Sequence, residues 1–501
     1  MAKFDFNPKT YEKKLQPLIR ELVAGKNYDK VLRCFPKTKT RLFTKAEVIA
    51  GLRYFGYPTD LVAKPIRTLS GVVPVTVLTK PYPCPGQCLY CPNDPTMPKS
   101  YLPNEPGGQR AVANHFDPFR QVSSRLKTYR ANNHPTDKIE LIVLGGTWSA
   151  YPKTYQTWFI KRCFEALNNQ PSASLKEAQK INETAKTRCI GLSLETRPDW
   201  ITKKELIHFR QLGCTKVQIG IQSLNNRILR LNQRGHTVTA TKKAIKLLRE
   251  FGFKIQAHWM ANLYGATFKT DIVDFKKLFS DKNFRPDELK IYPCSLIKTA
   301  PLYDYYQKGL WRPYTQQELL SVLIKALPLV PEYCRVSRMI RDFSSNDIVS
   351  GNKHSNLRQI VEEKVGKKIK EIRFREIRQR QINPDQLKLK IISYKTSIGT
   401  EKFLQFVTLN NQIAAFLRLS LPKNKTGAMI RELHVYGPTL ALGEAGKTQH
   451  LGLGRRLLLK AKTLASGYKS LAVISSIGTR EYYRRHGFKD GELYQHLKLV
   501  D

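Results

Sequence analysis

Three cysteines lie close together in the sequence, at Cys84, Cys88 and Cys91. Their Cys-x3-Cys-x2-Cys spacing allows three thiolates to cover one face of a [4Fe–4S] cluster, which leaves one iron open to a small molecule. A structural zinc ion normally takes four protein ligands, and no further Cys or His pair lies near the three cysteines, although a distant ligand stays an alternative. We therefore predict an iron–sulfur site with one open coordination position.

Further candidate binding residues directly follow three short apolar runs. They are the pair Gly145 and Gly146, then Glu195, then Gln222. Glycine allows a backbone to approach a ligand closely, and charged or amide groups can bind the polar groups of a small molecule. The same residues also serve as turns, strand ends and helix caps, so the residues alone leave both interpretations open.

A glycine-containing loop near the C-terminus is a second candidate site. Gln449, Gly452 and Gly454 form a Gln-x-x-Gly-x-Gly pattern, and a helical segment follows it. Glycines free backbone N–H groups, and a helix N-terminus carries a partial positive charge, so this loop can bind a pyrophosphate. Arg455 adds a formal charge. The pattern resembles the pyrophosphate loop of GNAT-type N-acetyltransferases.

Two tyrosines extend that resemblance, Tyr482 and Tyr483. In GNAT folds a tyrosine on the last helix reaches the thioester or thiol of coenzyme A. Core packing is the alternative for such a pair. We expect one of the two rings to be buried and the other to face the cofactor.

The elements that must hold these residues follow from hydrophobic periodicity. From residue 71 to 340, short apolar runs alternate with helical-period segments, which predicts an α/β fold with a parallel sheet. Six or seven such units suit a partial (β/α) barrel, whose active site lies at the C-terminal ends of the strands. The predicted strands are 72–78, 139–144, 189–194, 216–221, 253–257, 289–292 and 335–339.

The remaining segments have different patterns. Residues 1–70 are predicted as basic helices that either form a solvated surface or contact nucleic acid, and 341–385 as a linker segment. Residues 386–501 are predicted as a separate α/β domain of acetyltransferase type. Its predicted strands are 387–394, 403–408, 413–421, 429–436 and 471–474.

The charge of the chain indicates its partner. The 85 Lys and Arg residues outnumber the 40 Asp and Glu residues, for a formal net charge of +45 over 501 residues. A polyanion is the natural partner of such a protein, and nucleic acid is the first candidate. No apolar stretch is long enough to span a bilayer and no secretory signal is visible, so we expect a cytoplasmic protein without a membrane partner.

The cysteine spacing, placed after a first strand and before more β/α units, resembles the radical S-adenosylmethionine (SAM) enzymes. The resemblance implies that the open iron binds SAM and that SAM is cleaved to a 5′-deoxyadenosyl radical. It also implies that Gly145 and Gly146 contact the methionine end of SAM. Glu195 and Gln222 are then candidates for its carboxylate and ribose.

A radical SAM domain followed by a GNAT domain resembles the family of the Elongator catalytic subunit and its stand-alone bacterial and archaeal relatives. The order of the domains and of the matching segments carries the resemblance, which covers about residues 60 to 501. The matching segments are 64–71, 84–91, 137–138, 189–199, 232–237, 431–437 and 482–484.

This resemblance implies modification of the wobble uridine of tRNA. The radical would take hydrogen from the methyl group of acetyl-CoA, and the resulting carbon would add to C5 of uridine to give 5-carboxymethyluridine after hydrolysis. A stand-alone protein or homo-oligomer that binds the anticodon stem-loop is expected rather than a large complex. The residues implied to contact acetyl-CoA are Lys138, Glu432, Leu433, His434, Val435, Leu453, Gly454, Arg455 and Tyr483. The catalytic candidates are Lys138, Tyr482 and Tyr483.

Two other functions remain as alternatives. A lysine acetyltransferase with a purely structural cluster is one, but a strongly positive enzyme would repel basic protein tails. A nonenzymatic tRNA-binding scaffold is the other, but the intact cysteines and the intact glycine loop argue against it.

Overall fold

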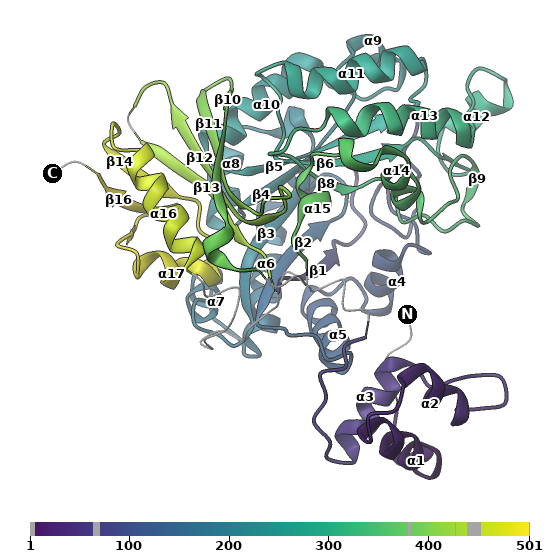
Figure 1. Ribbon diagram of the computed structural model, residues 1–501. Coiled ribbons are helices and arrows are strands. Elements are labelled where there is room, and N and C mark those ends of the chain that lie inside the picture. The colour runs from purple at the N-terminus through teal and green to yellow at the C-terminus, as the bar shows by residue number, and fades with distance from the viewer. Residues whose placement is uncertain (1–5, 64–70, 379–381, 426, 438–451, 500–501) are drawn as a thin grey trace.

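The centre of the molecule is a parallel sheet of seven strands that curls into a half-barrel (Figure 1). The computed structural model describes residues 6–63, 71–378, 382–425, 427–437 and 452–499. Each strand pairs in parallel with the next in the order β1-β2-β3-β4-β5-β6-β8. The strands are β1 (Val73–Leu78), β2 (Lys138–Leu144), β3 (Arg188–Thr196), β4 (Lys216–Gln222), β5 (Lys254–Ala261), β6 (Glu288–Pro293) and β8 (Arg335–Arg338). The predicted partial (β/α) barrel is thereby confirmed.

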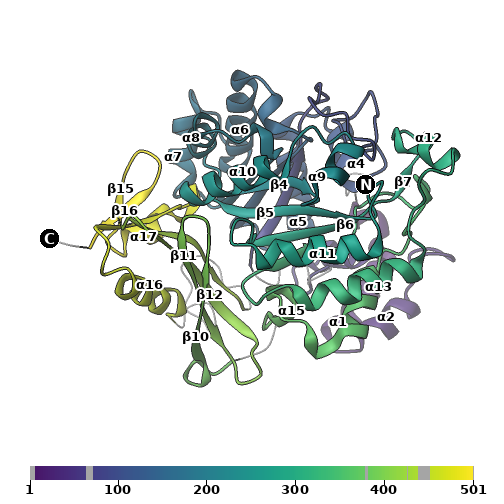
Figure 2. The same cartoon turned by 90° about the horizontal axis from the view of Figure 1, so that it is seen from above.

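Helices cover the outer face of this half-barrel (Figure 2). On β1 the residues Val73, Val75 and Val77 are fully buried toward the helices, whereas Pro74 and Thr76 are only half-buried on the inner face. This alternation follows from the two-residue period of a strand, and it leaves the inner face to polar side chains. The covering helices are α4 (Pro106–Ala113), α5 (Pro118–Ala131), α6 (Lys153–Asn168), α7 (Leu175–Asn182), α8 (Lys203–Gln211), α9 (Asn226–Leu231), α10 (Val238–Glu250), α11 (Phe268–Ser280) and α13 (Gln316–Ala326).

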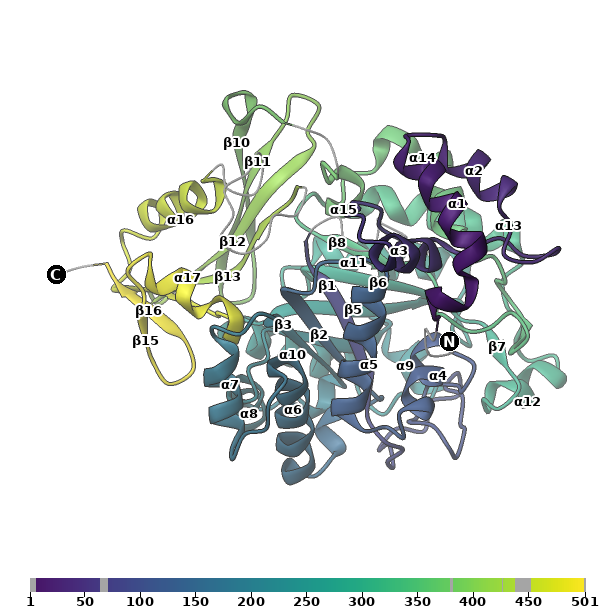
Figure 3. The ribbon, with the colours of Figure 1, turned by 90° about the horizontal axis from the view of Figure 1, so that it is seen from below.

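Three N-terminal helices form a small unit with its own core (Figure 3). They are α1 (Glu12–Val23), α2 (Tyr28–Cys34) and α3 (Lys45–Tyr54). The capping box expected at the start of α3 is present, because Thr44 and Glu47 bond to each other's backbone N–H groups. The unit contacts α5 through Arg53, which donates to the Arg130 carbonyl at 3.1 Å.

The C-terminal domain is built on a second sheet, with strand order β10-β11-β12-β13-β14-β16-β15. Strands β13 and β14 run parallel but pair only from Ala428 to Ile430, so the rest of β13 diverges from its neighbour. The short polar strands β15 and β16 lack apolar alternation and are absent from the sequence prediction. The elements are β10 (Lys388–Lys395), β11 (Gly399–Val407), β12 (Ile413–Pro422), β13 (Ala428–Val435), α16 (Leu453–Leu464), β14 (Ser470–Val473), α17 (Arg480–Arg484), β15 (Lys489–Asp490) and β16 (Gln495–Lys498).

The segment expected as a linker contains α14 (Leu357–Val365) and α15 (Ile372–Arg375). Leu357, Val361 and Ile372 are fully buried in the hydrophobic cluster that also holds both sheets. Smaller elements complete the fold: β7 (Leu296–Ile297), α12 (Leu302–Gln307) and β9 (Ile348–Ser350). Among the described residues, no helix has the length and apolar character that a bilayer crossing requires.

Buried charges join the two sheets. Asp287, fully buried at the start of the β6 region, receives hydrogen bonds from Arg431 of β13, and its carboxylate lies 3.6 Å from Arg418 of β12. Arg431 also donates to Glu401 of β11 at 3.0 Å. Burial opposes the ionisation of Asp287, but the arginine charges outweigh it and hold its pKa well below the ordinary value of 3.8. The two domains are therefore connected by charges that depend on one another.

Candidate active site

The three cysteines lie in the loop after β1, at the carboxyl end of the half-barrel. All three are free thiols; Cys88 and Cys91 are buried and Cys84 is half-buried. Cys84 Sγ lies 3.5 Å from Thr147 Oγ1, and Arg234 Nη1 donates to Cys88 Sγ at 3.5 Å. The Arg234 guanidinium thus lies directly against one of the three sulfur atoms of the loop.

The surroundings of this loop fit an iron–sulfur cluster with a small polar ligand. Arg197 Nη1 and Gln222 Oε1 are buried without hydrogen-bond partners among the described residues. A Cβ at Gly86 would collide with Arg197 Nη1 and reach within 3.6 Å of Cys88 Sγ, so the missing side chain allows the Arg197 guanidinium to lie against the cysteine loop. Within the described ranges no three of His, Cys, Asp and Glu converge on a single metal ion, whereas a cluster spreads its ligands over several irons.

The other residues expected to bind SAM lie at the same rim. Gly145 and Gly146 have φ values of +147° and +84°, and a Cβ on Gly145 would collide with Thr79. The glycine pair thus lets the end of β2 approach the end of β1 closely. Glu195 accepts a hydrogen bond from the Tyr101 hydroxyl at 2.8 Å, and Gln222 has a φ of +61°, which is strained for a residue other than glycine.

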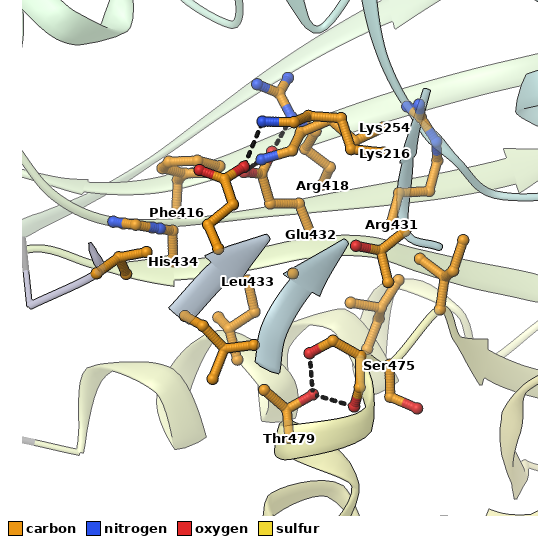
Figure 4. Close-up of a pocket in the computed structure, with 18 of the residues that line it drawn as sticks. Lys216, Lys254, Phe416, Arg418, Arg431, Glu432, Leu433, His434, Ser475 and Thr479 are labelled. Carbon is orange, nitrogen blue, oxygen red and sulfur yellow. Dashed lines mark hydrogen bonds and ion pairs between the residues drawn. The ribbon is translucent and has the colours of Figure 1, made fainter. Parts of the chain in front are cut away.

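A cavity of about 330 Å³ lies at the opposite end of the half-barrel, between the starts of its strands and the C-terminal sheet (Figure 4). Both domains contribute charged and polar side chains to its wall. The half-barrel residues among them are Glu140, Lys216, Lys254, Glu288 and Arg335, and the C-terminal domain adds Arg418, Arg431, Glu432, His434 and Tyr483.

Glu432 is the centre of charge in this cavity. Its carboxylate is 2.6 Å from Lys254 Nζ and 2.7 Å from Arg418 Nε. Burial opposes its ionisation, but Lys254 and Arg418 outweigh burial and lower the pKa of Glu432. Burial lowers the pKa of His434 to about 4, and its Nε2 has no hydrogen-bond partner among the described residues. His434 is therefore a neutral imidazole at neutral pH, and its Nε2 is available to bind a ligand.

The structure brings most of the expected acetyl-CoA residues to this end of the molecule. Glu432, Leu433, His434 and Tyr483 line the cavity, and Tyr483 is 6% exposed. Val435, the last residue of β13, does not line the cavity, although its neighbours His434 and Tyr436 do. Lys138, the first residue of β2, lies at the same rim but does not line the cavity either.

The glycine loop and Tyr482 lie together beside the start of α16. Gly452 precedes α16 with a φ of +67°, and Leu453, Gly454 and Arg455 form its first turn. A Cβ at Gly454 would approach Tyr482 Oη to 2.7 Å, so this hydroxyl lies over the N-terminal turn, and the Tyr482 ring is 36% exposed. Gln449 lies outside the described residues.

A row of polar side chains connects the two ends through the interior of the half-barrel. Near the cavity, Lys216 contacts Glu140 and lies 3.6 Å from Glu288. Further along, Gln218 accepts from Lys290 and lies 3.3 Å from His258 Nε2. The other ring nitrogen of His258 is 3.8 Å from Glu195, which lies at the cysteine rim. The interior is therefore hydrophilic along its length.

Apart from Glu432 and Glu195, the sequence analysis did not identify the charged residues of the cavity wall and the interior. Lys216 and Lys254 each begin a parallel strand, and Arg418 interrupts the apolar run of β12 while only 1% exposed. A charge within a run that is otherwise buried on both faces costs free energy unless it is paired, and this is the signal that could have marked these residues.

A half-barrel with a cysteine loop after its first strand and glycines at its second defines the radical SAM class. In agreement, residues 82–272 match the model of the radical SAM superfamily and 286–367 that of the radical SAM C-terminal domain. The chain is 42% identical to the tRNA uridine(34) acetyltransferase of Methanocaldococcus infernus, over 87% of each chain. It is 35% identical to human Elongator complex protein 3, over 86% of this chain and 84% of that protein.

A solved structure agrees with these relatives. The archaeal Methanocaldococcus infernus Elp3 with an N-terminal deletion superposes with a TM-score of 0.75 at 38% identity, and the match covers 86% of this chain and all of that one. The chain belongs to the Elongator Elp3 family. The radical SAM domain implies a [4Fe–4S] cluster and SAM as its cofactors.

Proposed function

We propose that this protein modifies the wobble uridine of tRNA to 5-carboxymethyluridine, with SAM and acetyl-CoA as co-substrates. The names of its relatives support the tRNA substrate, the uridine and the acetyl donor. The observation that carries the proposal is the polar interior of the half-barrel, which connects the cysteine rim with the cavity beside the acetyltransferase-type sheet. One protein can thus hold a radical source and an acetyl donor at the two ends of one polar interior.

At the cysteine rim, Cys84, Cys88 and Cys91 hold the cluster, which with SAM supplies one-electron chemistry. Arg234 orients Cys88 through its 3.5 Å hydrogen bond. Gly145 and Gly146 leave room for the methionine end of SAM. Glu195 and Gln222 bind its polar groups, and Gln222 Oε1 is a buried acceptor that still lacks a donor among the described residues.

At the other end, the first turn of α16 binds the pyrophosphate of acetyl-CoA with its free N–H groups and with Arg455. Glu432, Leu433, His434 and Val435 of β13 run beside the pantetheine arm, where β13 diverges from β14. Tyr482 and Tyr483 hold the thioester end, and Lys138 approaches it from the start of β2. Neutral His434 accepts a proton from the water that opens the thioester.

One anaerobic assay tests the whole proposal. Reconstituted full-length protein, a reductant, SAM, acetyl-CoA labelled in its methyl group and tRNA are incubated together, and the digested nucleosides are analysed by mass spectrometry. We expect the label in 5-carboxymethyluridine. Label on protein lysines instead would support the acetyltransferase alternative, and tRNA binding without any labelled product would support the scaffold.

Replacing Tyr483 with phenylalanine is expected to lower tRNA-stimulated hydrolysis of acetyl-CoA by about 10-fold or more, because Tyr483 lines the cavity and the loss of its hydroxyl would remove the proposed hydrogen bond to the thioester. The rate of CoA release, with and without tRNA, measures the effect. Tyr468→Phe, a half-buried tyrosine that bonds to the Pro422 carbonyl, is the matched control. Equal hydrolysis by wild-type protein and Tyr483→Phe would remove Tyr483 from the proposed site.

A further inference from the structure

A row of aromatic rings flanks the cysteine loop. Tyr82 lies two residues before Cys84, and its ring centroid is 4.7 Å from that of Tyr151. Tyr151 stacks on Tyr155 at 5.2 Å, and Tyr155 lies 5.6 Å from Trp158. The row therefore connects the cluster loop to the second turn of α6.

The two ends of this row are exposed although its middle is anchored. Tyr151 is 4% exposed, and its hydroxyl bonds to Thr79 Oγ1 and to the Lys80 carbonyl. Tyr82 is 37% exposed and Trp158 is 43% exposed. Core packing explains the anchored ring. It does not explain two large aromatic side chains that are left open to solvent at a candidate active site.

A lysine accompanies the rings. Lys80 Nζ lies 5.2 Å from the centroid of Tyr155, and Lys80 is exposed and pairs with no carboxylate among the described residues. Flat aromatic faces combined with a cation that is not neutralised are the features that bind single-stranded nucleic acid, because every base has a stackable face and each phosphate carries a charge.

We infer that Tyr82, Trp158 and Lys80 form a stacking surface for the anticodon-loop nucleotides that flank the modified uridine. The inference rests on the proposed function and adds to it the residues that hold the loop. A uridine that enters the half-barrel from the cysteine rim must leave the stack of its neighbours, and new stacking partners at that rim offset the cost. Tyr82 and Trp158 supply those partners, and Lys80 contacts one of the two phosphates between them.

An acidic protein that delivers electrons to the cluster is the other occupant to be considered. Interfaces with electron-transfer partners are small, below about 1,200 Å² in total, so the area available does not decide between the two occupants. The exposed rings of Tyr82 and Trp158 are separated by the buried Tyr151 and the half-buried Tyr155, a spacing that suits individual bases better than a continuous protein face.

The test is the affinity of the full-length protein for an anticodon stem-loop RNA with uridine at the wobble position. Trp158→Ala and Tyr82→Ala are each expected to weaken binding about 10-fold with an unchanged salt dependence, since stacking carries no charge. Lys80→Ala is expected to lower the slope of log affinity against log salt by about 0.7. Trp158→Phe, which keeps a flat ring, is expected to restore most of the affinity. Leu409→Ala, at a 75% exposed apolar residue of the β11–β12 turn, is the control.

The outcomes separate the inference from the proposed function. Wild-type protein that does not bind the RNA would contradict the proposed function itself. If wild-type protein binds the RNA and the Trp158 and Tyr82 variants bind it with the same affinity, the stacking surface alone is overturned. The Trp158 and Tyr82 variants could also keep the wild-type RNA affinity and lose turnover only when a flavodoxin-type reductant replaces dithionite. That result would overturn the stacking surface in favour of an electron-donor site.

Discussion

Replacement of Cys88 by serine is expected to abolish both the visible absorbance of the iron–sulfur cluster and all modification of tRNA. A cluster held by three thiolates cannot retain its geometry on two, and the alcohol of serine is a poor ligand for these irons. Cys88 is buried and receives the hydrogen bond of Arg234, so another side chain does not easily take its place. Anaerobic absorbance spectra and nucleoside mass spectrometry measure the two effects.

The exposed Cys34 offers a matched control for this experiment. Cys34→Ser makes the same chemical change far from the loop and is expected to leave both the absorbance and the modification unchanged. Modification that survives in Cys88→Ser at the wild-type rate would exclude a radical reaction at this loop. Zinc in place of iron in active wild-type protein would exclude it as well.

Replacement of Asp287 by asparagine is expected to destabilise the protein by about 3–5 kcal/mol. Breaking a buried ion pair leaves an uncompensated charge in the interior, and Asp287 is the partner of two buried arginines, Arg431 and Arg418. Because these arginines belong to the C-terminal domain, the loss of the Asp287 carboxylate also weakens the contact between the two domains beside the cavity. Urea unfolding at neutral pH measures the change. Asp342→Asn removes an Arg338 pair whose side chains are nearly half exposed, and is expected to cost less than about 1 kcal/mol.

The difference between wild-type protein and Asp287→Asn depends on pH. The pKa of Asp287 is lowered in the folded protein, so its charge stabilises the fold at pH values above the ordinary carboxyl pKa of 3.8. That stabilisation is lost only as the pH falls below 3.8 toward the lowered folded-state pKa. Unfolding curves should therefore differ equally at pH 5 and pH 7 and converge in strong acid. A difference that disappears between pH 7 and pH 5 would show that another group carries the effect.

Local patterns in the chain were sufficient to predict the strands of the half-barrel and five of the seven strands of the C-terminal sheet. The seven apolar runs of residues 71–340 became β1 to β6 and β8, because a helix-covered parallel strand needs apolar residues in one short run. The cysteine spacing and the glycine pair could be recognised for the same reason, since each depends only on near neighbours in the chain. The order of these motifs was also enough to indicate the family.

Contacts between distant residues had to come from the folded protein. Nothing in the sequence around Lys254 shows that it pairs with Glu432, which lies in another domain. Nor does the position of Tyr82 reveal its stacking against Tyr151.

The opposite placement of the cysteine loop and the cavity likewise depends on how the C-terminal sheet docks onto the half-barrel. Short-range periodicity selects helices and strands because it is set by backbone geometry. The pairing of buried charges and the meeting of two domains are set by packing over the whole chain, where any one residue contributes only a small part of the free energy.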